Sequence, residues 1–159
     1  EAFVKEISDN EYHVELTMRD ILSYKLDSDS LLIDTGSPHY VKKVDELKQF
    51  DVITEGARIR YDQTISTDGV NVDFLMNDNG KIHIRTYERG VEDETLACGT
   101  GVTASAIATS LWYGGNNIDI YTQIAKLNVR FDRENDIFKN IVLSGPAVHV
   151  FDGLFIFAK

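Results

Sequence analysis

A run of small residues in a helical pattern constrains the fold of this chain more than any other feature. The segment from Val102 to Tyr113 (VTASAIATSLWY) carries alanine, serine or threonine on almost every face, and Gly114-Gly115 supplies a stop. A helix with little side-chain bulk on any face suits tight enclosure by other elements. We therefore expect this helix to lie inside the fold.

Elsewhere, alternation of apolar and polar residues dominates, as in His13 to Met18 and Leu127 to Phe131. Alternation is typical of half-buried strands, and turn residues separate these segments. Asn71 to Met76 followed by Lys81 to Tyr87 predicts a hairpin. The residues expected on one apolar face of its first strand are Val70, Val72, Phe74 and Met76.

The last third of the chain, from Ile118 to Phe157, predicts four short strands, and a second helical piece is expected near Asp45 to Phe50. No repeat or linker divides the sequence. We expect residues 1–159 to form a single α+β domain, in which a mostly antiparallel sheet is wrapped around, or packed on, the helix that follows Cys98.

Composition excludes several classes of protein. The 159 residues are 43% hydrophobic, enough for a substantial core, and the net charge of -10 argues against a nucleic-acid or anionic-membrane surface. No apolar run approaches the roughly 20 residues of a membrane span, and the start lacks the apolar core of a signal peptide. A cytoplasmic protein is the expectation.

The counts of cysteine and histidine narrow the chemistry further. One cysteine excludes an internal disulfide, and four scattered histidines argue against a zinc site, so no metal is expected. The sequence begins at Glu1 rather than at methionine. We expect it to be a piece of a longer protein.

Cys98, the sole cysteine, stands in a glycine-flanked turn just before the enclosed helix. A helix N-terminus stabilises a thiolate through its dipole and its unpaired N–H groups, and the same groups, from Gly99 to Gly101, can hold a carboxylate. The alternative is an inert buried cysteine. The backbone of Gly99-Thr100-Gly101, which allows a ligand to approach closely, favours the functional interpretation.

Strand parity indicates a second candidate. Ile82, Ile84 and Glu88 share one face of the predicted strand, so a core-facing Ile82 implies a core-facing Glu88. An inward carboxylate must be paired or functional, and pairing with an arginine or a backbone amide is the structural alternative. Arg89 would point away unless Gly90 breaks the strand.

Two polar residues have weaker patterns. Gly36-Ser37-Pro38-His39 follows an apolar strand and predicts a turn with a polar tip, where an ordinary loop is the simpler interpretation. His39 gains interest only as a proton partner for a thiol. Asn71 follows Asp68-Gly69 at a strand entrance, where asparagine is common for turn reasons alone.

Together these segments resemble the C-terminal half of the diaminopimelate epimerase family, which consists of pyridoxal-independent amino-acid epimerases. The resemblance covers most of the chain and is most specific at Tyr87-Glu88-Arg89-Gly90 and Glu94-Thr95-Leu96-Ala97-Cys98-Gly99-Thr100-Gly101. Four further segments support it in the right order: Gly36-Ser37-Pro38-His39, Ala57-Arg58-Ile59-Arg60, Asn71-Val72-Asp73-Phe74 and Ser144-Gly145-Pro146-Ala147.

The resemblance implies interconversion of LL- and meso-2,6-diaminopimelate, a step toward lysine and peptidoglycan precursors, by two facing cysteines without a cofactor. Cys98 would be the second cysteine, acting as acid in one direction and base in the other. Glu88 and His39 would assist proton traffic, with Glu88 also contacting substrate. Asn71 and Arg89 would grip the distal end of the amino acid.

The resemblance further implies that the backbone of Gly99 and Thr100 binds the reacting α-carboxylate. Where the family has a substrate-contacting asparagine, this chain has Ser37, and the loop from Arg89 to Cys98 is one residue longer than usual. The implied partners are the amino-acid substrate, an N-terminal lobe of the same protein, and a second copy in a homodimer.

That N-terminal lobe would carry the first catalytic cysteine in an Asn-Gly-rich loop, and nothing in this sequence corresponds to it. The chain is therefore expected to be the C-terminal lobe, inactive alone, with a final strand from Leu154 to Phe157 returning toward the other lobe.

The competing interpretations are a proline racemase-like or phenazine-type isomerase of the same superfamily, and a non-catalytic carboxylate-binding module. Alkylation of Cys98 that persists below neutral pH favours an enzyme, whereas an unreactive, fully buried thiol favours the module.

Overall fold

The computed structural model describes residues 1–157, which form eleven strands and two helices. In chain order these elements are β1 (Ala2–Ser8), β2 (Glu11–Thr17), β3 (Tyr24–Leu26), β4 (Ser30–Asp34), β5 (Pro38–Lys43), α1 (Val52–Arg60), β6 (Asn71–Asp78), β7 (Lys81–Glu88), β8 (Asp93–Thr95), α2 (Gly99–Tyr113), β9 (Asn117–Tyr121), β10 (Lys126–Glu134) and β11 (Ile137–Val148).

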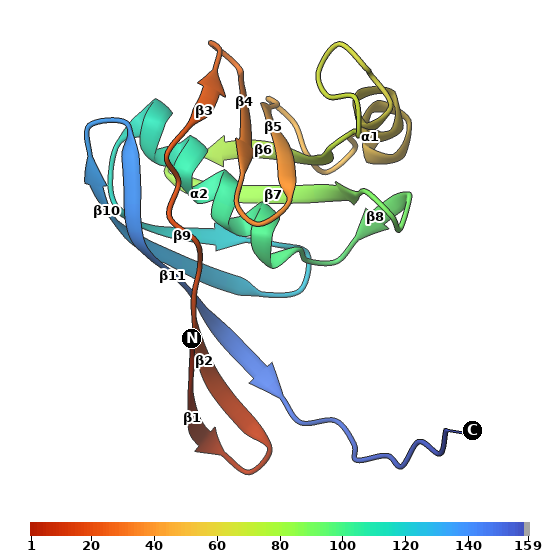
Figure 1. Ribbon diagram of the computed structural model, residues 1–159, viewed down its shortest axis with the longest axis vertical. Coiled ribbons are helices and arrows are strands. Elements are labelled where there is room, and N and C mark those ends of the chain that lie inside the picture. The colour runs from red at the N-terminus through yellow and green to blue at the C-terminus, as the bar shows by residue number, and fades with distance from the viewer. Residues whose placement is uncertain (158–159) are drawn as a thin grey trace.

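All strands belong to one sheet, ordered β1-β2-β11-β10-β9-β7-β6-β5-β4-β3, with β8 paired to β7. The pairs β5–β6 and β7–β9 are parallel, and the other strand pairs are antiparallel. The sheet curls around α2, which crosses the body of the molecule between its strands (Figure 1). The expected α+β class, with a mostly antiparallel sheet around a helix, is confirmed.

An isolated bridge ties the region just before β3, at one end of the sheet, to β11, which lies far from β3 in the strand order. The backbone groups of Ile21, just before β3, exchange hydrogen bonds of 2.9 and 3.0 Å with those of Phe138 on β11. Both side chains are buried in the core around α2. The bridge thus holds the region before β3 against β11.

The small residues of α2 explain why it can be enclosed. Every residue from Gly101 to Ser110 is buried, and the helix contacts β4, β5, β6, β7, β9 and β10. Alanine, serine and threonine allow these strands to approach the helix axis, as the sequence predicted. No helix of the described residues is long and apolar enough to cross a membrane.

A second core lies on the outer face of β6 and β7, beneath α1. It includes Val70, Val72 and Phe74, with Met76 packed at its edge, so the predicted hairpin and its apolar face are confirmed. The helix expected at Asp45 to Phe50 was wrong: these residues form bends and a turn, and α1 begins at Val52. Asp51 caps α1 by accepting a 3.0 Å bond from the Thr54 N–H, which fixes the start of the helix after the predicted segment.

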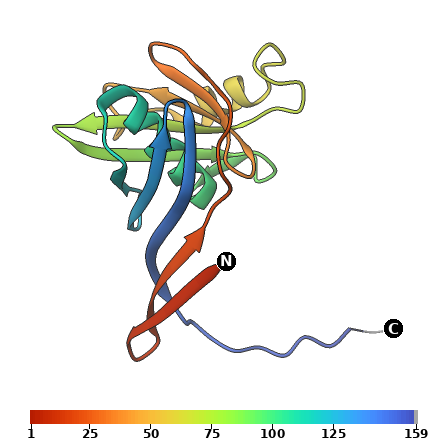
Figure 2. The ribbon, with the colours of Figure 1, turned by 60° about the vertical axis from the view of Figure 1, so that its left-hand side comes forward.

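Two segments project from the body. The hairpin β1–β2, paired with the end of β11, forms an arm, and residues 149–157 form a tail that continues from β11 (Figure 2). Three strands, not four, lie between Ile118 and Phe157, because Leu154 to Phe157 pair with no strand of the described chain. These tail side chains are largely exposed, at 91% for Leu154.

Ser105 provides a test of the enclosure. Its hydroxyl is buried in α2 and has no hydrogen-bond partner among the described residues, whereas the Thr109 hydroxyl donates a 2.8 Å bond to the Ser105 carbonyl. Replacing Ser105 with alanine removes an unsatisfied polar group, so Ser105→Ala should raise the free energy of unfolding by about 1 kcal/mol. Thr109→Val loses a bond and should lower it by about 1 kcal/mol. Urea denaturation measures both, and destabilisation by Ser105→Ala would contradict the assignment.

Candidate active site

Cys98 is the N-cap residue of α2, in extended conformation with φ −128° and ψ 115°. Its position at the helix start agrees with the sequence, although α2 begins at Gly99, three residues before the predicted Val102. The thiol is half-buried and makes no capping bond to the helix. The N–H groups of the first turn, which lie at the positive end of the helix dipole, are therefore available to bind an anion.

Thr100 connects the thiol to the buried histidine. Its Oγ1 lies 3.3 Å from the Cys98 Sγ and 2.9 Å from the His39 Nε2. The Thr100 backbone is fixed as well, because the Thr35 hydroxyl donates a 2.9 Å bond to its carbonyl. Cys98, Thr100 and His39 thus form one hydrogen-bonded chain.

His39 lies in β5 and is fully buried, so its expected place at the tip of a polar turn was wrong. The bend ends at Ser37 and the strand begins at Pro38, which turns the imidazole inward beneath α2. The His39 Nδ1 lies 2.7 Å from the Asp73 Oδ2, and both side chains are 0% exposed. The other Asp73 oxygen, Oδ1, accepts a 2.7 Å bond from the Thr86 hydroxyl.

This buried pair decides the charge of the imidazole. Burial alone would lower the pKa of His39, but the charge and hydrogen bond of Asp73, helped by Cys98, raise it from 6.5 to about 10. The first turn of α2 lies directly over the carboxylate, since a Cβ on Gly101 would collide with the Asp73 side chain. The positive end of the helix dipole thus faces Asp73 as well as Cys98.

Asn71 organises the polar residues at the mouth of the site. Its side-chain amide donates to the Ser37 hydroxyl and, at 3.0 Å, to the Pro38 carbonyl, while its oxygen accepts a 2.9 Å bond from the Arg89 N–H. The Arg89 guanidinium lies 3.3 Å from the Gly69 carbonyl. The structure therefore brings Ser37, Asn71 and the Arg89 backbone together, while the Arg89 side chain faces the Asp68 and Gly69 carbonyls. A substrate-binding role for these residues stays a prediction.

Glu88 is the last residue of β7 and is half-buried, with Ile82 and Ile84 of the same face buried in the core. Its Oε1 accepts a 2.7 Å bond from the Thr95 hydroxyl on β8. At Gly90, where φ is +94°, the backbone leaves the strand, which is the interruption that the sequence allowed. No hydrogen bond joins Glu88 to Cys98 within residues 1–157; the thiol is linked to His39 instead.

Asp73 and Thr86 were missed as site residues by the sequence reasoning. They face each other across the antiparallel pair β6–β7, on the side that packs against α2. The apolar face of Val72 and Phe74 drew attention to the opposite side of β6. Leu75, which shares the face of Asp73 and is buried, was the available signal that both sides are covered.

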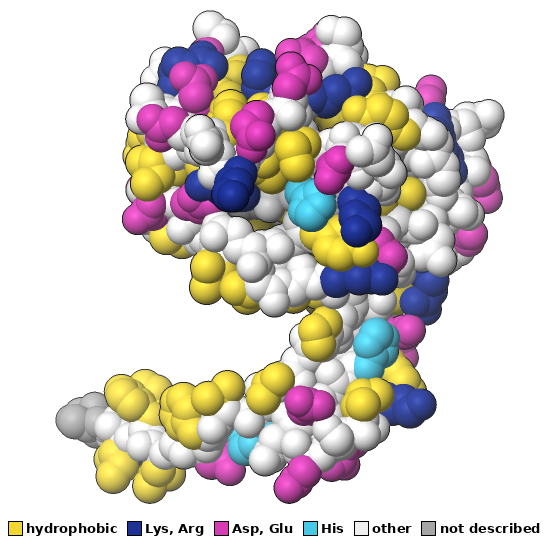
Figure 3. Space-filling view, turned by 180° about the vertical axis from the view of Figure 1, so that it is seen from behind, with side chains coloured by type: hydrophobic (Ala, Val, Ile, Leu, Met, Phe, Trp, Pro, Cys, Tyr) yellow, Lys and Arg dark blue, Asp and Glu magenta, His cyan; other side chains and the backbone are white. Residues whose placement is uncertain are grey.

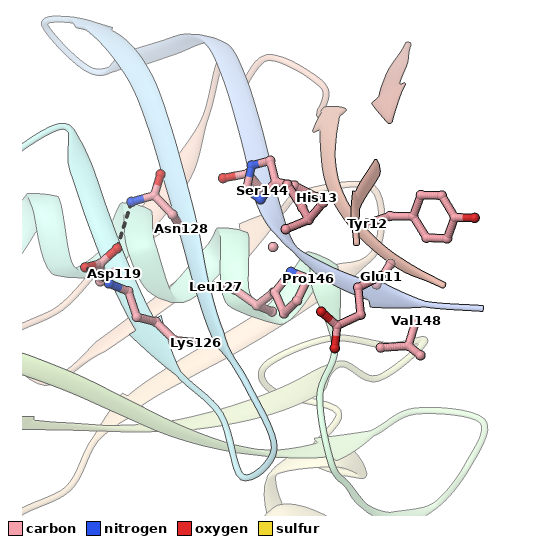
Figure 4. Close-up of a pocket in the computed structure, with 13 residues that line it drawn as sticks. Glu11, Tyr12, His13, Asp119, Lys126, Leu127, Asn128, Ser144, Pro146 and Val148 are labelled. Carbon is pink, nitrogen blue, oxygen red and sulfur yellow. Dashed lines mark hydrogen bonds and ion pairs between the residues drawn. The ribbon is translucent and has the colours of Figure 1, made fainter. Parts of the chain in front are cut away.

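A separate groove of about 480 Å³ lies where the arm meets the body (Figure 4). Its lining includes Tyr12, Leu127 and Pro146, and it contains none of the residues linked to Cys98. The described part of the chain holds no cluster of three histidine, cysteine or acidic side chains suited to a metal ion. The network around Cys98 is thus the candidate site.

The buried ion pair predicts how stability depends on pH. Since the pKa of His39 is higher in the folded protein than in the unfolded chain, the contribution of the pair is complete below pH 6.5 and is lost as pH rises toward about 10. The free energy of unfolding, measured with urea across this range, should fall more steeply for the wild type than for His39→Gln. Equal slopes in the two proteins would refute the charged state of His39.

Comparisons with known proteins identify the family of the chain. The family profile described as diaminopimelate epimerase matches residues 31–150. Diaminopimelate epimerase of Flavobacterium psychrophilum is 46% identical over 87% of this chain and 56% of its own length, and that of Chlorobaculum tepidum is 40% identical over 76% and 48%. A crystal structure of a phenazine biosynthesis protein of the PhzF family from Enterococcus faecalis covers 75% of this chain and 42% of its own, at 14% identity and a TM-score of 0.49. The chain spans about half the length of the curated relatives it matches, and it belongs to the diaminopimelate epimerase family.

Proposed function

We propose that this chain supplies one half of the catalytic centre of an epimerase that inverts the α-carbon of diaminopimelate, on the route to lysine and peptidoglycan precursors. The observation that carries the proposal is the placement of Cys98. Its half-buried thiol caps the enclosed helix α2 and joins a buried network through Thr100. Membership of the family supports the substrate, because the relatives are named for diaminopimelate.

The first turn of α2 is the proposed binding site for the reacting α-carboxylate. The N–H groups of Gly99 and Thr100 have no partner within the helix, and the Cys98 side chain leaves them uncapped. A carboxylate held there would place the substrate Cα beside the Cys98 sulfur. The distal end of the substrate would reach the polar mouth formed by Ser37, Asn71 and Arg89.

Cys98 would then act on the α-proton directly. As a thiolate it removes the proton from Cα, and as a thiol it returns a proton to the same face in the reverse direction. The carbanion is stabilised by the same helix N–H groups, whose dipoles are already fixed by the helix. This electrostatic stabilisation would serve without a pyridoxal cofactor.

Inversion needs a second acid–base group on the opposite face of Cα, and we assign it to a second lobe of the protein. The proposed docking surface is the arm and tail, whose apolar side chains stand clear of the body (Figure 3). Exposed residues of this surface are Phe3, Val4, Ile7, Val148, Val150, Phe151, Leu154, Phe155, Ile156 and Phe157. A patch of this extent is typical of an interaction surface. A homodimer of the two-lobe protein remains the expectation for its assembly.

Conversion of LL- to meso-diaminopimelate in deuterated buffer, followed by NMR as deuterium incorporation with inversion at Cα, tests the function. The longer protein that contains this chain should invert the α-carbon, and Cys98→Ala should reduce the rate of inversion on the order of 10³-fold, because one of the two acid–base groups is lost. Residues 1–159 alone should give no inversion. Turnover by this chain alone at the rate of the longer protein would refute the two-lobe requirement, and an active Cys98→Ala would refute the role of the thiol.

A further inference from the structure

We infer that Asp73 is a positioning residue that holds His39 against Thr100, so that the Thr100 hydroxyl directs a hydrogen bond at the Cys98 sulfur. The inference deepens the proposed function, on which it rests for the acid–base role of Cys98. No role is predicted from the sequence for Asp73. For Thr100, a role is predicted for the backbone but none for the side chain.

The geometry fixes the imidazole from both sides. The His39 Nδ1 is 2.7 Å from Asp73, and Nε2 is 2.9 Å from the Thr100 hydroxyl, so the ring spans the space between β6 and the start of α2. Asp73 itself cannot turn freely, because Thr86 donates to its other oxygen at 2.7 Å. Gly101 lets the helix backbone lie over the carboxylate where any side chain would collide.

The hydrogen-bonded network of Cys98, Thr100 and His39 has two protonation states, which differ in the positions of two protons and not in their number. With a neutral imidazole, Nε2 accepts from the Thr100 O–H, whose oxygen accepts from the Cys98 S–H. When the thiol proton passes to the Thr100 oxygen, the hydroxyl proton passes to Nε2, which leaves a thiolate and an imidazolium. No atom is lost or gained, and the Thr100 hydroxyl now donates to the sulfur.

Asp73 favours the second state. The ionisable groups that act on the ring are Asp73 on β6 and Cys98 before α2, and both favour the imidazolium. A buried carboxylate beside Nδ1 both orients the ring and stabilises its positive charge, as second partners of histidine commonly do. Glu88 does not share this role, because its carboxylate is engaged by Thr95.

The test follows His39 by nitrogen-15 NMR and Cys98 by its rate of alkylation with iodoacetamide as a function of pH, both in residues 1–159. Neither measurement requires epimerase activity, so failure of this inference is distinguishable from failure of the proposed function. In the wild type, both ring nitrogens of His39 should carry protons at neutral pH. A ring without a proton on Nδ1 would overturn the inference even if no variant folded.

Asp73→Asn should lower the midpoint of His39 titration strongly from near 10, because burial then acts without the opposing carboxylate. It should also slow alkylation at neutral pH about tenfold, because the sulfur loses a charge-supported hydrogen bond. Thr100→Val should slow alkylation by a similar factor, while His39 stays protonated because the Asp73 carboxylate is still present. Thr100→Ser, which keeps the hydroxyl, should restore the wild-type rate.

Thr109→Val serves as the matched control, since it removes a buried threonine hydroxyl from the same helix outside the network. It should leave both the His39 titration and the alkylation profile unchanged. If Asp73→Asn leaves both measurements at their wild-type values, or if Thr100→Val reacts as fast as Thr100→Ser, the inference is refuted.

Discussion

The enclosure of α2 by the sheet is the constraint on which the rest of the structure depends. Six strands contact this helix, and they can do so because its side chains from Gly101 to Ser110 are mostly small. Its first turn consequently lies over the buried Asp73 of β6, although Gly99 itself is exposed. Toward that buried side the helix dipole acts more strongly than it would at a wet surface. The position of Cys98 therefore follows from packing that lies well away from the thiol.

The buried ion pair of His39 and Asp73 depends on the same enclosure. Taking two charges out of water is costly, and the cost is offset only where geometry is good and the remaining hydrogen bonds are made. Here Thr86 and Thr100 complete those bonds, and the start of α2 faces the carboxylate. Apolar residues in place of both partners could give similar stability, but with both charges buried each partner depends on the other and can hold only one position. We regard its contribution as one of orientation.

Elements defined by local pattern could be predicted from the sequence. The helix after Cys98, the hairpin of β6 and β7 and the inward parity of Ile82 and Ile84 all follow from the spacing of apolar residues. The start of α1 could not be predicted from this spacing, since a single capping bond to Asp51 decides where the helix begins. The strand predicted in the tail was also wrong. A strand needs a pairing partner, and the residue pattern of the tail does not show whether one is present.

The site itself was only partly visible for a related reason. Cys98 and its flanking glycines can be recognised from the local sequence. The environment of His39, in contrast, forms only where β5, β6 and α2 meet in space. The register of the parallel pair β5–β6 sets His39 beside Asn71 and Val41 beside Asp73. A sequence contains this register only through long-range packing, so Asp73 looked like an ordinary polar residue of an alternating strand.

Two kinds of apolar residue in this chain bear on the proposed two-lobe centre. Those around α2 are buried by the chain itself, whereas those of the arm and tail, such as Phe3 and Phe155, remain exposed. The exposed apolar side chains of the arm and tail do not stabilise the fold of this chain. Burying them against a partner would remove their apolar surface from water, which is favourable. In the proposed reaction, Cys98 likewise acts on only one face of the substrate Cα. A partner that covered the arm and tail while presenting a second acid–base group would meet both requirements in one association, which links assembly of the protein to completion of its catalytic centre.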